Sequence, residues 1–148
     1  MNSRAPRLIR SLLLVPALAC AVPVLAQSNN PRINPQNLYH YWIRLNTTVN
    51  TDLPNSGLNL DKPGCAAVTF TIGSDGVPMD VQLVKLVPRS DLGNAAVTAV
   101  KNFRYGPSLT NRIGQPIDTY YVVPFNAPDG AGGMQKVMEP CKLPGYGQ

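Results

Sequence analysis

Histidine, charged residues and long apolar runs are all scarce in this sequence, and each scarcity excludes a class of protein. Its 148 residues include one histidine, His40, which we expect at the surface or in packing. No Gly-x-Ser-x-Gly or His-Glu-x-x-His motif occurs, and no two carboxylates stand at helical spacing. Nothing therefore groups a nucleophile, a general base or metal ligands. The sequence predicts no catalytic residue, no metal site, no cofactor and no small-molecule substrate.

Positive charge is also less abundant than the net charge of +5 suggests. Three of the arginines, Arg4, Arg7 and Arg10, precede an apolar run at the N-terminus. Without residues 1–26, ten basic residues stand against eight acidic ones, which leaves a net charge of +2. These ten are scattered singly, whereas phosphate binding favours a clustered basic patch. Nucleic acid is not an expected partner.

The first 26 residues have the basic, apolar and small-residue regions of a secretory signal peptide. The apolar run from 11 to 26 is shorter than the ~20 residues that a membrane helix needs. Cleavage after Ala26 would make Gln27 the first residue of an exported protein. Two alternatives remain. The segment is retained as a membrane anchor, or the lipobox-like Ala17–Cys20 is lipidated at Cys20, which gives an envelope lipoprotein.

The three cysteines become two once a signal peptide is removed. Cys65 and Cys141 then remain, and an oxidising compartment favours a disulfide between them. The bridge would tie the first core strand to the Gly- and Pro-rich tail 128–148. Closing so long a loop contributes about 4 kcal/mol in chain-entropy estimates. The alternative is a pair of buried, unpaired thiols.

The segment before the core combines a polar stretch with an apolar periodicity. Residues 27–35 are polar and interrupted by prolines, which predicts a flexible lead-in. Asn34 and Pro35 are typical of a helix start, and the apolar residues that follow share one helical face. A strand from Tyr39 to Leu45 is the alternative, because β-branched residues follow. Trp42 is expected to anchor the core rather than to serve as a binding platform.

Residues 65–83 predict two strands joined by a tight turn. Alternation puts Ala66, Val68, Phe70 and Ile72 on one face of the first strand. Asp75-Gly76 is a hairpin signal, because glycine tolerates the positive φ that such turns need. In the second strand the alternation puts Val77, Met79, Val81 and Leu83 on one face.

A helix and a last strand complete the predicted core, 65–125. Ser90 or Asp91 is expected to cap the helix, and Arg104 to be the cation at its end. The apolar stripe of the helix consists of Leu92, Ala95, Ala96, Ala99, Val100 and Phe103. In the strand 117–125, Pro124 indicates a sheet edge, because proline cannot donate a ladder hydrogen bond.

These elements predict an α+β fold for a domain spanning 36–127. A small antiparallel three-stranded sheet carries one helix, in the order strand-strand-helix-strand, and an N-terminal helix precedes it. The tail 128–148 follows and is pinned by the disulfide.

The order of motifs in the core resembles the C-terminal domain of the TonB family. The motifs are Val68–Ile72, Asp75-Gly76, Val77–Leu83, Ala95-Ala96 with Val100, Phe103–Pro107, Gly114–Pro116 and Val122–Phe125. The helix before the core and Cys65 at the strand start are also similar to the related TolA domain. This resemblance covers roughly 60 residues.

The resemblance implies a periplasmic module that binds a protein by pairing its sheet edge with a strand of the partner. The implied partner is an outer-membrane transporter or another envelope protein. The implied site is the last strand, at Asp118, Tyr120, Tyr121, Val122 and Val123, although Tyr121 is equally well explained as a core residue. A membrane-anchored energy transducer is the alternative function. The short N-terminal run and the absence of a long Pro/Lys/Glu-rich spacer argue against it.

Overall fold

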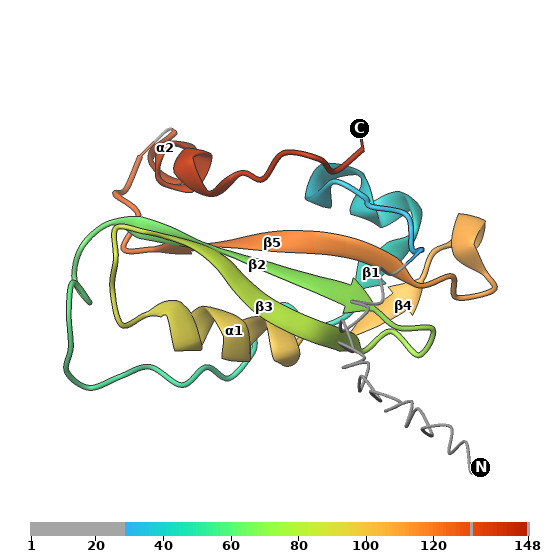
Figure 1. Cartoon of the computed structure of the whole chain (residues 1–148), viewed down its shortest axis with the longest axis horizontal. Coiled ribbons are helices and arrows are strands. Elements are labelled where there is room, and N and C mark those ends of the chain that lie inside the picture. The colour runs from blue at the N-terminus through green and yellow to red at the C-terminus, as the bar shows by residue number, and fades with distance from the viewer. Residues whose placement is uncertain (1–28, 131, 148) are drawn as a thin grey trace, which may run out of the picture.

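The computed structural model describes residues 29–130 and 132–147. The predicted cleavage site at Ala26 and Gln27 and the predicted lipidation site at Cys20 lie outside these residues. In chain order the elements are the 3₁₀ helix η1 (Pro35–His40), β1 (Trp42–Arg44), β2 (Gly64–Ile72), β3 (Pro78–Val87), α1 (Gly93–Lys101), β4 (Tyr105–Pro107), η2 (Leu109–Asn111), β5 (Ile117–Phe125), α2 (Gly133–Met138) and η3 (Glu139–Cys141) (Figure 1).

A three-stranded antiparallel sheet of order β3-β2-β5 forms the centre of the fold. The helix α1 covers one face of it, and α2 with the C-terminal tail lies on the opposite side from α1 (Figure 1). The central strand β2 has no exposed residue, because it is covered on both faces and paired on both edges. The predicted α+β fold, with strand-strand-helix-strand order and one helix packed on the sheet, is confirmed.

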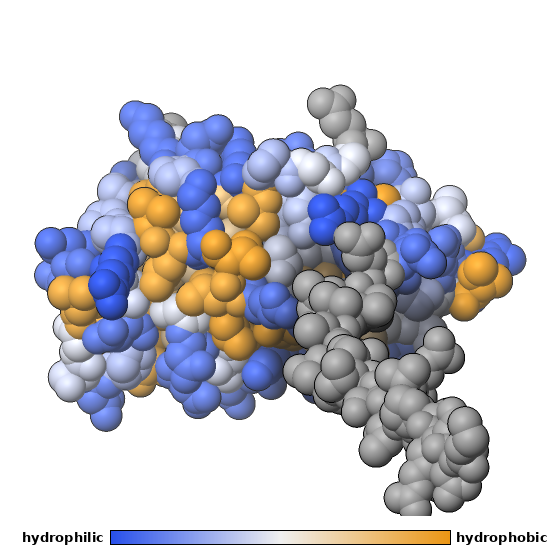
Figure 2. All heavy atoms as spheres, in the orientation of Figure 1, coloured by the Kyte–Doolittle hydropathy of each residue, from blue (hydrophilic) through white to orange (hydrophobic). Residues whose placement is uncertain are grey.

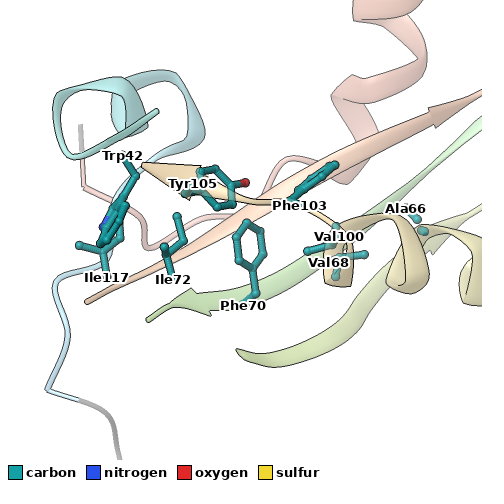
Figure 3. Close-up of a cluster of buried hydrophobic side chains, with 10 residues drawn as sticks. Trp42, Ala66, Val68, Phe70, Ile72, Val100, Phe103, Tyr105 and Ile117 are labelled. Atoms are coloured by element: carbon teal, nitrogen blue, oxygen red, sulfur yellow. The ribbon is translucent and has the colours of Figure 1, made fainter. Parts of the chain in front are cut away.

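The main core lies between α1 and the sheet and extends to the aromatic residues of β1 and β4 (Figure 3). The four β2 residues predicted to share a face all enter it, and so do Ala96, Val100 and Phe103 of the predicted stripe. Trp42 is 1% exposed, and its Nε1 donates a hydrogen bond to the Gln115 carbonyl at 3.1 Å. The prediction that Trp42 anchors the core is confirmed.

The predicted N-terminal helix is much shorter in the structure, and part of the alternative strand from Tyr39 to Leu45 forms instead. Asn34 does cap a helix, because its side chain accepts a hydrogen bond from the Gln36 amide at 3.0 Å. This 3₁₀ helix ends at His40, and the chain then becomes the strand β1, which pairs antiparallel with β4. The segment Tyr105–Pro107, which follows the predicted helix, is itself extended. It offers β1 a partner, and this pairing outweighs the local helical pattern.

The predicted alternation in β3 holds for Val81 and Leu83, which lie on the core side, but is wrong for Met79, because the strand is bulged twice against β2. Register shifts fall between the partners of Thr69 and Thr71 and between those of Ala67 and Val68. At the first shift Asp80 has φ +52°. Each bulge inserts one residue and reverses the faces that follow. Met79 therefore pairs with Thr71, on the face opposite the core, and is 50% exposed.

Neither predicted cap closes the start of α1. The N-cap residue is Leu92, which has no side-chain cap. Ser90 accepts a hydrogen bond from the Leu92 amide instead, and Asp91 accepts one from the Leu58 amide, so that it fastens the loop before β2. At the other end Arg104 donates to the Lys101 and Phe103 carbonyls. Its predicted role as the helix-end cation is confirmed.

The buried Tyr105 and the partly buried Tyr146 make the fold sensitive to alkaline pH. Burial raises the pKa of the Tyr105 hydroxyl far above its usual value, although the nearby Arg44 opposes the shift. Burial also raises the pKa of Tyr146, and Arg32 opposes that shift. Above pH ~10 the unfolded chain releases these protons while the folded chain keeps them. The stabilisation is therefore complete below pH ~10 and is lost as the pH rises above it.

We expect the free energy of unfolding to fall as the pH rises above ~10, and Tyr105→Phe to flatten this fall. Urea unfolding at a series of pH values measures the slope. Tyr39→Phe is the matched control, because the Tyr39 side chain is 61% exposed, and it should keep the wild-type slope. An unchanged slope in Tyr105→Phe contradicts the prediction.

Candidate functional site

A disulfide joins the C-terminal tail to the central strand. Cys65 and Cys141 are bonded, with a sequence separation of 76, and both are 0% exposed. They belong to a second buried cluster on the sheet face opposite α1. This cluster also contains Ala67, Tyr120 and Val122, and the tail residues Met138, Leu143 and Tyr146 pack against it. The predicted Cys65–Cys141 bridge is confirmed.

The chain before η1 lies along the first part of β5. The Asp118 amide donates to the Pro31 carbonyl at 3.0 Å, and the Ile33 amide donates to the Asp118 carbonyl at 2.9 Å. Ile33 also packs against the main core. This part of the predicted flexible lead-in is therefore attached to the sheet, because its backbone completes the edge and its one large apolar side chain is partly buried.

Beyond Asp118 the outer edge of β5 is open among the described residues. Backbone groups alternate sides along a strand, so Tyr120 and Val122 direct their N–H and C=O groups the same way as Asp118, away from β2. No backbone pairing of Tyr120 or Val122 on this side occurs in residues 29–130 and 132–147. The next outward position is Pro124, which has no N–H. The open edge is therefore two outward positions long.

A groove of about 270 Å³ runs along this open edge. Tyr120, Tyr121 and Val122 contribute from β5. Asn34, Pro35 and Gln36 line it from the start of η1, and Met138 and Lys142 line it from the tail. Figure 1 shows the same arrangement, with β5 beside both η1 and the chain that follows α2. The groove therefore has the edge of β5 as its floor, the start of η1 as one wall and the tail as the other.

The predicted site residues gather at this strand, but most of their side chains point elsewhere. Tyr120 and Val122 are 4% and 5% exposed in the second cluster. Tyr121 and Val123 pack against the main core, where the Tyr121 ring lies 5.1 Å from that of Phe103. The Asp118 carboxylate accepts hydrogen bonds from Thr71 at 2.7 Å and Asn30 at 3.1 Å. What the strand offers a partner is therefore mainly backbone.

The walls of the groove were not predicted from the sequence. Asn34, Pro35 and Gln36 were interpreted only as a helix start, and Met138 and Lys142 only as part of a tail. The one signal that pointed to the tail wall is Cys141, since a disulfide to Cys65 at the sheet requires the neighbouring residues to lie near β5.

The opposite sheet edge, β3, has features that discourage pairing. It is bulged twice, it begins at Pro78, and Lys85 is exposed near its end. Bulges, proline and lysine are the usual means by which proteins protect an edge strand. Figure 2 shows an apolar patch on this side of the molecule, interrupted by hydrophilic side chains. The exposed large apolar residues of β3 are Met79, Leu83 and Val84, at 50%, 40% and 47%. By contrast, β5 keeps an unbroken register with β2 from Ile117 to Phe125.

The described residues contain neither a cluster of metal ligands nor a membrane-spanning helix. In residues 29–130 and 132–147, His, Cys, Asp and Glu side chains nowhere form a group of three that could bind a metal ion. His40 is exposed, with its ring centroid 4.0 Å from that of Tyr39. Within the same ranges, no helix has both the length and the apolar character to cross a membrane.

Comparison with known proteins identifies a family, and solved structures that are similar include one of a TonB domain. The family model for the C-terminal region of the Gram-negative bacterial TonB protein matches residues 51–126. The solution NMR structure of the TonB C-terminal domain of Pseudomonas aeruginosa is similar at 21% identity, with a TM-score of 0.42. The match covers 61% of this chain and 90% of that one. The sequence matches no curated protein.

Proposed function

The chain belongs to the family of Gram-negative bacterial TonB protein C-terminal domains, and we propose that it is a periplasmic module that binds an extended protein segment along β5. Domains of this family take part in TonB-type envelope transport and interact with other proteins. The observation that carries the proposal is the two-residue open edge of β5 at a groove of about 270 Å³.

Strand addition suits the chemistry of this groove. Tyr120 and Val122 together offer two N–H donors and two C=O acceptors, which a partner strand satisfies whatever its side chains are. The open edge has only two outward positions among the described residues, so the site is short. A segment that is extended before it binds fits this site better than a folded surface does.

We further propose that the segment belongs to an outer-membrane transporter or to another envelope protein. The family assignment supports this partner, and the predicted signal peptide supports delivery of the domain to the periplasm. The proposal involves no catalytic step. Binding itself would be the function of the domain.

Replacing Val122 by proline tests the edge directly. Proline removes the outward N–H and places its ring at the open edge, while proline at an outward edge position leaves the β2–β5 ladder intact. We expect at least about tenfold weaker binding of short peptides that cover the periplasm-facing segments of outer-membrane transporters, because one of four backbone hydrogen bonds is lost and the ring obstructs the strand. Titration calorimetry measures the affinity, and circular dichroism checks the fold.

Leu83→Pro is the matched control on the other edge. Leu83 pairs with Val68, which in turn pairs with Tyr121, so ladder alternation directs the Leu83 N–H away from β2. The variant should bind the peptides like the wild-type protein. Equal weakening by both prolines, or weakening only by Leu83→Pro, contradicts β5 as the receiving edge. A wild-type protein that binds none of the peptides contradicts the transporter partner.

A further inference from the structure

The C-terminal tail has the geometry of a fixed binding element. The residues that the family model matches end at 126, so the whole tail lies beyond them. Its Cys141 is bonded to Cys65 and is fully buried. Near its end, the Gly147 amide donates to the Arg32 carbonyl at 3.1 Å, and the Tyr146 ring lies 4.8 Å from that of Tyr120. The segment from 141 to 147 is thus held at two places.

Two side chains of the tail reach the groove beside β5. Met138 and Lys142 flank Cys141 in the sequence, three residues before it and one after it, and both line the groove. The Lys142 amide donates to the Glu139 carbonyl at 3.2 Å, which orders the backbone at this point. Because Cys141 is fixed by the disulfide, the position of Lys142 relative to β5 is fixed too.

Among the described residues that line the groove, Lys142 is the one with a charged side chain. The other lining residues are polar or apolar and include no Asp, Glu, Lys or Arg: Asn34, Pro35, Gln36, Tyr120, Tyr121, Val122 and Met138. Lys142 also forms an ion pair with Glu139, but this pair is exposed, with side chains 55% and 65% accessible. Exposed pairs are weak, so the ammonium group remains available to an acidic side chain that a partner strand brings close.

From this geometry we infer that the disulfide-pinned tail selects the segment bound at β5, and that the segment carries an acidic side chain at the Lys142 end of the groove. The inference rests on the proposed function. Backbone pairing gives affinity for any extended segment, and Lys142 then favours acidic segments over neutral or basic ones. The disulfide contributes by holding Lys142 against the groove.

A charge swap tests the inference. The probe is the tightest-binding transporter peptide that contains a Glu, together with the same peptide carrying Gln or Lys in its place. We expect Lys142→Glu to bind the Glu peptide about fivefold more weakly than the wild type does, and the Lys peptide more tightly. Lys136→Glu is the matched control, because Lys136 is an exposed residue of α2 that does not line this groove. It should bind all three peptides like the wild type.

Release of the tail gives a second, independent readout. In the double variant Cys65→Ala/Cys141→Ala, checked for folding by circular dichroism, the preference for Glu over Gln should disappear. Equal weakening by Lys142→Glu and Lys136→Glu would indicate a general charge effect and overturn the inference. So would a preference that survives in the folded double variant. If the peptides bind the wild type and the Lys142→Glu variant with equal affinity, the inference is overturned but the proposed function is not. If no peptide binds the wild type, the proposed function is overturned together with the inference.

Discussion

Loss of the Cys65–Cys141 disulfide is expected to lower the free energy of unfolding by about 4 kcal/mol. The bridge spans 76 residues, from the central strand to the tail, so it strongly restricts the unfolded chain. Small domains are stable by about 5–15 kcal/mol, so the loss is a large fraction of the total. Urea unfolding of the wild-type protein and of the Cys65→Ala/Cys141→Ala variant measures it.

Two controls separate the bridge from the packing of its sulfur atoms. Wild-type protein unfolded under reducing conditions lacks the bridge but keeps both sulfurs, so its loss should be close to that of the double variant. Without the bridge, the tail is attached to the sheet through its packing against the second cluster, so we expect the tail to detach before the core unfolds. Limited proteolysis should release the tail 128–148 before it cuts the core. A loss below about 1 kcal/mol in both forms would show that the tail is held mainly by Tyr146, Leu143 and Met138.

The parts of this fold that the sequence predicted are those that depend on local patterns. In β2 a two-residue alternation identified the core face, and in the helix a stripe of small apolar residues identified the side that packs on the sheet. These patterns suffice because one face of each element must be buried wherever its partner lies. The Cys65–Cys141 bridge was predictable as well, since only two cysteines lie outside the predicted signal peptide.

What the sequence did not predict depends on contacts between distant segments. The strand β1 was predicted only as an alternative to a helix, because its pairing partner, the extended segment Tyr105–Pro107, is distant in the sequence. The bulges in β3 reverse its faces, and alternation cannot show a reversal that is set by register against β2. The candidate site divides in the same way. The edge strand was predicted from Pro124 and the resemblance. The walls of the groove were not, because they come from two segments, 34–36 and 138–142, that are far apart in the sequence.

Gly76 is another position at which a correct local prediction missed a distant contact. The sequence indicated a glycine in a tight turn, and Gly76 has φ +76° there. The structure adds that its carbonyl accepts a hydrogen bond from the Tyr105 amide at 2.9 Å. A Cβ at this position would lie 1.9 Å from the Tyr105 carbonyl oxygen. The turn therefore lies directly against β4, with no space for a side chain.

We expect Gly76→Ala to destabilise the fold by about 3 kcal/mol or more, because the added methyl group strains the backbone and pushes β4 away. Gly132→Ala is the matched control, since Gly132 has φ +83° and a Cβ there meets nothing within 4 Å. It retains the backbone strain without the clash and should cost only about 1–2 kcal/mol. Urea unfolding of the two variants gives the difference, and tryptophan fluorescence reports on Trp42, whose ring lies 3.5 Å from the added atom. Equal losses in the two variants would mean that backbone strain alone determines the requirement for glycine, and that the contact between the turn and β4 yields without cost.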